Sequence, residues 1–242
     1  MTDFRHFKAL SFDCYGTLID WETGMSVALR KWADGIGVSA SEQDLLELVS
    51  EIETVVQAER SPAPLYPEVL AEVLRRIGDR LGVEVTEADA ERFGGTVGDW
   101  PAFPDSPSAL SRLGCRFRLV IVSNVDRASF AASNQRLGVT FDKIITAEDV
   151  GAYKPRPEHF EALFDSLPTM GINRDELLHV AQSLYHDHEP ARRLGLPSVW
   201  IDRGRDPSGT GATPPPTDRS LQPRWRFPTL EAFADAAIST DE

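Results

Sequence analysis

The sequence predicts an α/β fold: a doubly wound parallel sheet with an inserted helical subdomain. Five short apolar runs, rich in β-branched residues, are typical of strands that are buried on both faces. These runs are Ala9–Phe12, Leu119–Val122, Lys143–Thr146, Leu178–Ala181 and Ser198–Ile201. Helical patterns separate the last four runs, and strands that alternate with helices indicate a parallel sheet.

The remaining elements of this sheet domain follow from apolar spacing and from helix stop signals. We expect helices over Ala128–Leu137, Glu158–Ser166 and His188–Leu194, a short strand over Trp225–Phe227 and a closing helix over Thr229–Ala237. Gly138 and Gly195 directly follow two of the helical patterns. Glycine commonly ends helices at this position, which supports the predicted boundaries.

A long segment between the first two strands has a different pattern, because it is charged, amphipathic and helical in its spacing. Helices are expected over Val27–Ile36, Glu42–Arg60, Pro67–Leu81 and Glu87–Val97. We therefore predict a helical domain over 19–103, inserted into a core domain formed by 1–18 and 104–242. Aromatic residues near the joints and turns are expected mainly to pack, with one or two lining a cleft; they are Trp21, Trp32, Tyr66 and Trp100.

Composition excludes several classes of protein. The chain of 242 residues has a net charge of −13, which argues against nucleic acid as a partner. With two cysteines, it has neither a disulfide framework nor a zinc-site pattern. No apolar run is long enough to span a bilayer and no apolar leader follows the start, so we expect a cytoplasmic protein without a membrane partner.

Polar residues stand at four predicted strand ends, and these ends converge on one crevice in a parallel sheet. Asp13 is the candidate nucleophile, and Lys154 would keep it ionised. Asp187 would orient Lys154 or activate water. Hydrogen bonds to an anionic substrate or to developing charge are expected from Thr17, Ser123 and Asn124.

Each of these residues also has a purely structural explanation. Ser123 and Asn124 are good helix caps, Lys154 could belong to a solvated turn, and Asp187 could be an acid in the first turn of a helix. The four strand ends together favour a site. Cys14 is not expected to react, because the residue after Asp13 should point away from the crevice.

The motifs that carry this chemistry resemble those of the haloacid dehalogenase-like hydrolase superfamily. They are Asp13–Leu18, Val122–Asn124, Tyr153–Pro155 and Ala181–Asp187, in the order of that family and across most of the chain. The resemblance implies a Rossmann-like core domain, an inserted helical cap and an aspartate nucleophile that forms a covalent intermediate.

Phosphatases form the main branch of this superfamily, and the chain departs from their pattern twice. They usually carry a general-acid aspartate two residues after the nucleophile, where this chain has Tyr15. Their fourth motif commonly reads Gly-Asp-Ser-x-x-x-Asp and holds magnesium, and this chain has Gln182 in place of its first aspartate. A magnesium phosphatase with an altered site, binding Mg²⁺ through Asp13 and Asp187, stays as an alternative.

The metal-independent L-2-haloacid dehalogenases resemble the chain more closely in their first motif. That resemblance implies that Asp13 displaces halide from the α-carbon, that water then cleaves the ester with the help of Asp187, and that no metal is needed. Ser123 and Asn124 would contact the carboxylate or halide. Further contacts to substrate are expected from Tyr15, Gln182 and Ser183.

Three departures from the dehalogenase pattern concern substrate specificity. Phe160 replaces a usual tyrosine, and Gln182 and Leu184 replace a serine and an asparagine. The region around Ser50–Glu53 lacks the arginine that an early cap helix usually supplies, and Arg30 or Arg60 would have to substitute.

The sequence therefore predicts a hydrolase, and more finely a dehalogenase-like enzyme acting on a small-molecule anionic substrate, an α-substituted carboxylic acid. A non-catalytic binding protein that retains the pocket is the alternative from another class. We expect a monomer or a homodimer.

Overall fold

The computed structural model describes residues 4–59, 62–204 and 213–239. Its centre is a six-stranded parallel sheet in the order β3-β2-β1-β4-β5-β6. The strands are β1 (Ala9–Phe12), β2 (Arg118–Ser123), β3 (Lys143–Thr146), β4 (Leu177–Ala181), β5 (Ser198–Ile201) and β6 (Trp225–Phe227). The predicted α/β fold with a doubly wound sheet is confirmed.

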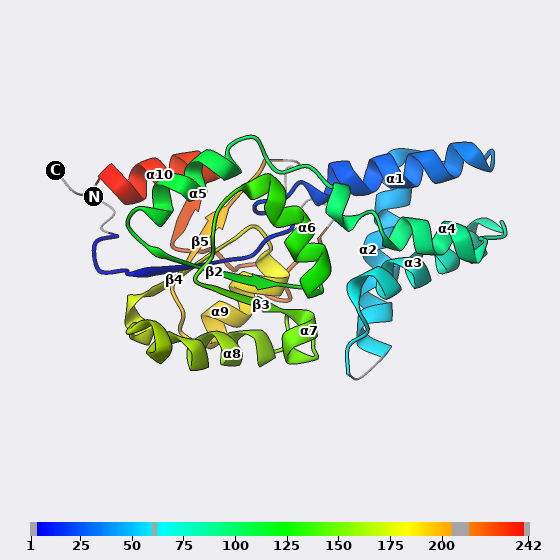
Figure 1. The fold of residues 1–242 in the computed structure, drawn as a ribbon. Coiled ribbons are helices and arrows are strands. Elements are labelled where there is room, and N and C mark those ends of the chain that lie inside the picture. Colours follow the sequence, from blue (N-terminus) through cyan, green and yellow to red (C-terminus); the bar gives the residue numbers. More distant parts are fainter. Residues whose placement is uncertain (1–3, 60–61, 205–212, 240–242) are drawn as a thin grey trace.

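Two helical layers cover the sheet, as Figure 1 shows. Helices α5 (Ser106–Gly114) and α10 (Leu230–Ile238) lie on one face, and α8 (Glu158–Ser166) and α9 (Glu189–Arg193) lie on the other. The alternation of side chains along each strand produces these two layers. Leu10 and Phe12 of β1 join one hydrophobic cluster, while Ala9 joins the other.

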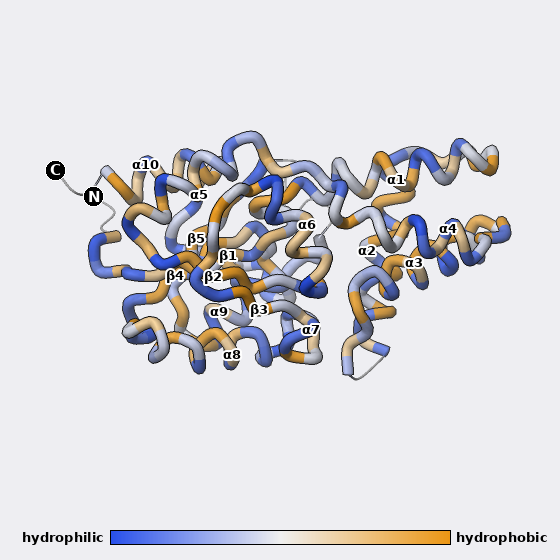
Figure 2. Tube along the Cα trace, viewed as in Figure 1, coloured by the Kyte–Doolittle hydropathy of each residue, from blue (hydrophilic) through white to orange (hydrophobic). Residues whose placement is uncertain are grey.

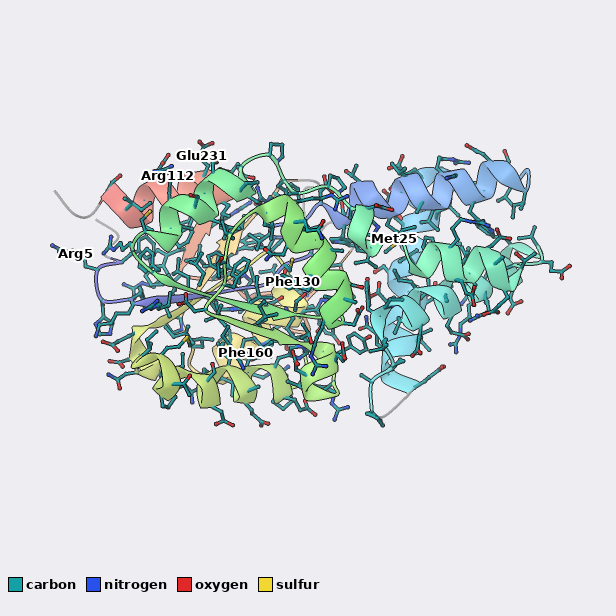
Figure 3. All side chains as sticks on the ribbon, in the orientation of Figure 1. Arg5, Met25, Arg112, Phe130, Phe160 and Glu231 are labelled. Atoms are coloured by element: carbon teal, nitrogen blue, oxygen red, sulfur yellow. The ribbon has the colours of Figure 1, made fainter. Side chains whose placement is uncertain are left out.

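Phenylalanines from the two layers illustrate this packing. Phe130, on α6 (Arg127–Leu137), belongs to the first cluster, and Phe160, on α8, belongs to the second. Both are labelled in Figure 3. Figure 2 shows the hydrophobic colour concentrated along the central strands, with hydrophilic stretches on the outer helices. The strands are therefore held between two apolar layers, which fixes the positions of their ends.

The segment between β1 and β2 forms a group of helices beyond one end of the sheet (Figure 1). It contains α1 (Trp21–Gly35), α2 (Glu42–Glu59), α3 (Tyr66–Leu81), α4 (Glu87–Gly94) and the short 3-10 helix η1 (Val97–Asp99). Backbone hydrogen bonds join the incoming and outgoing chains, from Asp20 N to Pro101 O and from Phe103 N to Leu18 O. The division into a cap domain over 19–103 and a core domain stays a prediction.

Several helix boundaries differ from the predictions. Helix α1 begins at Trp21 rather than Val27, because the Asp20 carboxylate accepts a hydrogen bond from Thr23 N and caps it there. The pattern over Glu87–Val97 divides into α4 and η1, which are separated at Gly95.

Other differences concern elements of the sheet domain. The expected helix His188–Leu194 corresponds to α9, which is shorter, and a π-helical turn, η4 (Leu184–His188), directly precedes it. Helix α5 and the short α7 (Ala147–Val150) were not predicted. Across the described parts of the chain, no helix combines the length and the hydropathy needed to cross a membrane.

Candidate active site

Lys154 is the central residue of the candidate site. Its ammonium nitrogen lies 2.9 Å from Asp13 Oδ1, 2.7 Å from Asp187 Oδ1 and 2.9 Å from the carbonyl oxygen of Val122. The side chain is 1% exposed. An ammonium group has three hydrogens, so these three acceptors use all of them. The structural alternative of a solvated turn is therefore wrong for Lys154.

Asp13 follows β1 directly, and its carboxylate is held on two sides. Thr17 Oγ1 donates to Asp13 Oδ2 at 2.6 Å, and Lys154 contacts the other oxygen. Thr17 is itself fixed, because its hydroxyl oxygen accepts a hydrogen bond from Gln182 N at 2.9 Å. Burial raises the pKa of Asp13, while the charge of Lys154 and the Thr17 hydrogen bond favour the ionised form.

Asp187 is fully buried and belongs to a hydrogen-bonded chain that sequence reasoning missed. His179 Nε2 lies 3.0 Å from Asp187 Oδ1, and His179 Nδ1 lies 2.9 Å from Ser11 Oγ. A carboxylate only accepts, so Nε2 donates to Asp187, and in the neutral ring Nδ1 then accepts from Ser11. Despite burial, Lys154 and His179 hold the pKa of Asp187 below its usual range. Ser11 and His179 are polar residues inside two apolar strand runs, and they lie opposite each other in the sheet; these polar positions were the available sequence signal.

Asn124 and Ser123 follow β2, and the structure gives them different surroundings. The Asn124 amide accepts from Lys154 N at 2.7 Å and donates to Lys154 O at 3.1 Å. Asn124 therefore positions the lysine backbone, which leaves at most one amide hydrogen for a substrate. Ser123 Oγ is buried and has no hydrogen-bond partner among the described residues.

One pocket brings six of the nine predicted site residues together. Asp13, Tyr15, Asn124, Lys154, Ser183 and Asp187 all line it. Thr17, Ser123 and Gln182 are buried beside these lining residues. The Tyr15 hydroxyl lies 2.8 Å from Ser133 Oγ, and Ser183 Oγ accepts from His186 N at 3.0 Å.

The helical group supplies the other wall of this pocket. Trp21 and Tyr66 line it, which confirms the expectation that one or two aromatic residues near the joints do so. Polar residues of α2 also contribute, and sequence reasoning missed their role; they are Ser50, Glu53, Thr54 and Gln57. Glu53 and Gln57 directly follow the buried Ile52 and Val56, so the edge of the apolar stripe was the available signal.

The candidate arginines do not complete the pocket. Arg30 instead contacts Ala40 O and pairs with Asp34 on the helix surface. Arg60 lies outside the described residues. Phe160, where a tyrosine was expected, is fully buried and packs against the His179 ring at 5.3 Å.

Two more side chains near the site are buried. Cys14 is fully buried, and burial raises the pKa of its thiol. His188 is held by Ala181 O and Ser198 Oγ at 2.9 and 2.8 Å.

The residues around Asp13 and Asp187 differ from a usual magnesium donor set. Mg²⁺ is held by carboxylates and waters in octahedral geometry. Here the Lys154 ammonium lies between the two carboxylates, and the neutral Gln182 stands where the fourth motif commonly has its first aspartate. Within the described residues, no cluster of three His, Cys, Asp or Glu side chains could hold a metal.

The buried carboxylates and the lysine lie at the carboxyl ends of parallel strands, where open α/β sheets bind their ligands. The model of the haloacid dehalogenase-like hydrolase family matches residues 7–195. The chain belongs to this family of enzymes, and the predicted resemblance is confirmed.

Individual relatives include both dehalogenases and phosphatases. The chain is 26% identical over 210 residues to (S)-2-haloacid dehalogenase 4A of Burkholderia cepacia, covering 83% of this chain and 85% of that one. It is also 26% identical over 204 residues to the glyceraldehyde 3-phosphate phosphatase of Methanopyrus kandleri, covering 82% and 85%.

Solved structures show the same fold. The L-2-haloacid dehalogenase from Xanthobacter autotrophicus superposes with a TM-score of 0.76 at 20% identity, covering 94% of this chain and 97% of that chain.

Proposed function

We propose that the protein is a metal-independent hydrolase that acts on a small α-substituted carboxylic acid through an ester on Asp13. In the first step, an Asp13 carboxylate oxygen attacks the α-carbon, and the halide leaves with the bonding electron pair. In the second step, water attacks the Asp13 carboxyl carbon, and the substrate oxygen leaves as a hydroxyl. The products are a 2-hydroxy acid, halide and a proton, with Asp13 restored.

The position of Lys154 is the observation that supports this proposal most directly. Its ammonium charge lies between Asp13 and Asp187, where it offsets their mutual repulsion and favours the ionised nucleophile. Thr17 donates to the Asp13 oxygen that Lys154 does not contact. The nucleophile is thus held by two donors from fixed elements and faces the pocket.

Asp187 is suited to the second step. Its Oδ2 atom is buried and has no hydrogen-bond partner among the described residues, so it can accept a hydrogen bond from the attacking water molecule and orient it. The unpartnered Ser123 Oγ can donate a hydrogen bond to a substrate oxygen that reaches it. The relative from Burkholderia cepacia, a 2-haloacid dehalogenase by name, supports the same substrate class.

The test is product release by the purified protein with EDTA or with added Mg²⁺. Panels of 2-haloacids and of phosphate esters are compared side by side. Halide release that persists in EDTA is the expected result. Phosphate release that requires Mg²⁺ would instead support the phosphatase alternative. The relative from Methanopyrus kandleri, a phosphatase by name, is consistent with that alternative. Ligand-induced stabilisation without turnover on either panel would indicate a binding protein.

An Asp13→Asn variant tests the nucleophile itself. The amide is a poor nucleophile but has the same shape, so turnover should be abolished while the thermal unfolding transition persists. Substantial turnover by the folded variant would contradict the proposed step.

A further inference from the structure

The wall of the pocket that α2 provides carries a half-buried carboxyl group, Glu53. Gln57 Nε2 donates to Glu53 Oε1 at 2.7 Å, and the Tyr66 hydroxyl is also hydrogen-bonded to this carboxyl. Gln57 and Tyr66 line the pocket beside Glu53. Both neighbours hold Glu53 as an acceptor, which leaves its other lone pairs for a donor in the pocket.

Charge in the pocket is unusually negative for a site that takes an anion. Asp13, Asp187 and Glu53 contribute three carboxyl groups. Among the described lining residues, Lys154 alone carries a positive charge, and all its hydrogens go to Asp13, Asp187 and Val122 O. Burial lowers the pKa of His186 to about 4, so that ring is neutral at pH 7.

Among the described residues Glu53 has hydrogen-bond donors but no cationic partner, so a donor group or a positive charge on the ligand would add to the two hydrogen bonds it already accepts. Burial raises the pKa of Glu53 to about 7, so a large fraction is ionised in neutral solution. Removing water from such a group on ligand binding is costly unless the ligand supplies a hydrogen bond or an opposite charge. A plain alkyl chain against Glu53 would supply neither a hydrogen bond nor a charge, so the cost of removing water would not be offset.

We propose that Glu53 is a specificity-determining residue and that the substrate carries a hydroxyl or ammonium group that donates to it. This inference rests on the proposed function, because it describes the end of the substrate that lies away from the carbon attacked by Asp13. It also deepens that function: an unfunctionalised 2-haloacid would be a poor substrate, and one with a donor on its next carbon would be a good one.

Halide release from three matched acids tests the proposal in the whole protein. The acids are 2-chloropropanoate, 2-chloro-3-hydroxypropanoate and 3-amino-2-chloropropanoate, which differ only in the donor group. We expect kcat/KM to be about ten-fold or more higher for the two donor-bearing acids, the effect of one hydrogen bond to a charged group. Equal values for the three acids would overturn the proposal.

Two substitutions separate charge from hydrogen bonding. Glu53→Gln keeps an acceptor oxygen, so the preference for the hydroxyl acid should persist while the preference for the ammonium acid falls. Glu53→Leu should remove both preferences. Glu47→Gln is the matched control, because Glu47 lies on the same helix and accepts from a glutamine four residues away, but is exposed. Its preferences should equal those of the wild type.

A binding measurement distinguishes failure of this inference from failure of the proposed function. Propanoate, 3-hydroxypropanoate and β-alanine are unreactive counterparts of the three acids, and calorimetry gives their Kd values. Tighter binding of the latter two, lost in Glu53→Leu, would support the role of Glu53 even if no halide were released from any acid. Halide release together with Kd values that Glu53→Leu leaves unchanged would overturn that role alone.

Discussion

At the scale of single residues, the site depends on how one buried cation is shared. Lys154 contacts two carboxylates that are 0% and 8% exposed. Each carboxylate also has a second polar partner, Thr17 for Asp13 and His179 for Asp187. Removing the cation would leave two buried negative charges close together, and such an uncompensated charge is far more costly than a missing surface ion pair.

Lys154→Met should therefore destabilise the protein by about 3–5 kcal/mol and abolish turnover. Urea unfolding measures the free energy of unfolding, and Lys143→Met, a change of an exposed lysine on β3, is the control. Stability close to that of the wild type would show that the two carboxylates do not need the ammonium group.

At the scale of elements, Gly24 of α1 packs closely against Trp100, which in turn contacts two residues of the pocket wall. A Cβ atom added at Gly24 would lie 2.3 Å from Cδ1 of Trp100. The Trp100 ring packs edge-to-face on Tyr15 and Tyr66, with centroid distances of 5.6 and 6.3 Å. Because both tyrosines line the pocket, the position of α1 is coupled to the shape of the site.

Gly24→Ala should destabilise the protein by about 1–3 kcal/mol, because overpacking outweighs the gain in helix propensity of about 1 kcal/mol. At Gly35, the last residue of the same helix, an added Cβ would meet no heavy atom within 4 Å. Gly35→Ala should be neutral or slightly stabilising. Thermal denaturation of both variants and the wild type measures these effects. If the two substitutions had equal effects, the close contact with Trp100 would not constrain α1.

At the scale of the whole molecule, buried histidines should make stability depend on pH. Burial lowers the pKa of His159 to about 3 and those of His186 and His188 to about 4. These rings stay neutral in the folded state, whereas the unfolded chain binds protons below its ordinary histidine pKa of about 6.5. Their contribution to stability is therefore complete above pH 6.5 and is lost as pH falls towards 4.

We expect the free energy of unfolding to fall between pH 6.5 and 4, with each histidine contributing roughly 1.4 kcal/mol per pH unit. Glu53 acts in the opposite direction, because its raised pKa of about 7 gives stability that is present at low pH and lost as pH rises from 4.5 to 7. The fall on acidification should thus be steeper in Glu53→Gln than in the wild type. Urea titrations at a series of pH values measure both slopes, and a flat profile would contradict neutral buried histidines.

The sequence predicted the sheet and the site residues that follow its strands, because both depend on local patterns. The run Lys143–Thr146 and the short strand Trp225–Phe227 have the predicted bounds. Asp13 and Asp187 meet because each follows a neighbouring strand, β1 or β4. Periodicity and strand-end chemistry are sufficient for these features.

The other wall of the pocket could not be predicted in the same way. Glu53 and Gln57 reach the pocket only through the packing of α2 against the rest of the molecule, and no motif marks them. The π-helical turn Leu184–His188 was also missed, although Ser183 caps its start by accepting a hydrogen bond from His186 N. Such features depend on tertiary contacts rather than on local sequence.

A single-turnover reaction in oxygen-18-labelled water tests the ester on Asp13 most directly. With protein in excess over a donor-bearing 2-haloacid, water attacks the Asp13 carboxyl carbon, so the account predicts heavy oxygen in the Asp13 peptide and unlabelled oxygen in the first 2-hydroxy acid released. Mass spectrometry of both species reads the outcome. Heavy oxygen in the first product, with an unlabelled Asp13 peptide, would mean that water attacks the substrate directly, and it would contradict the account.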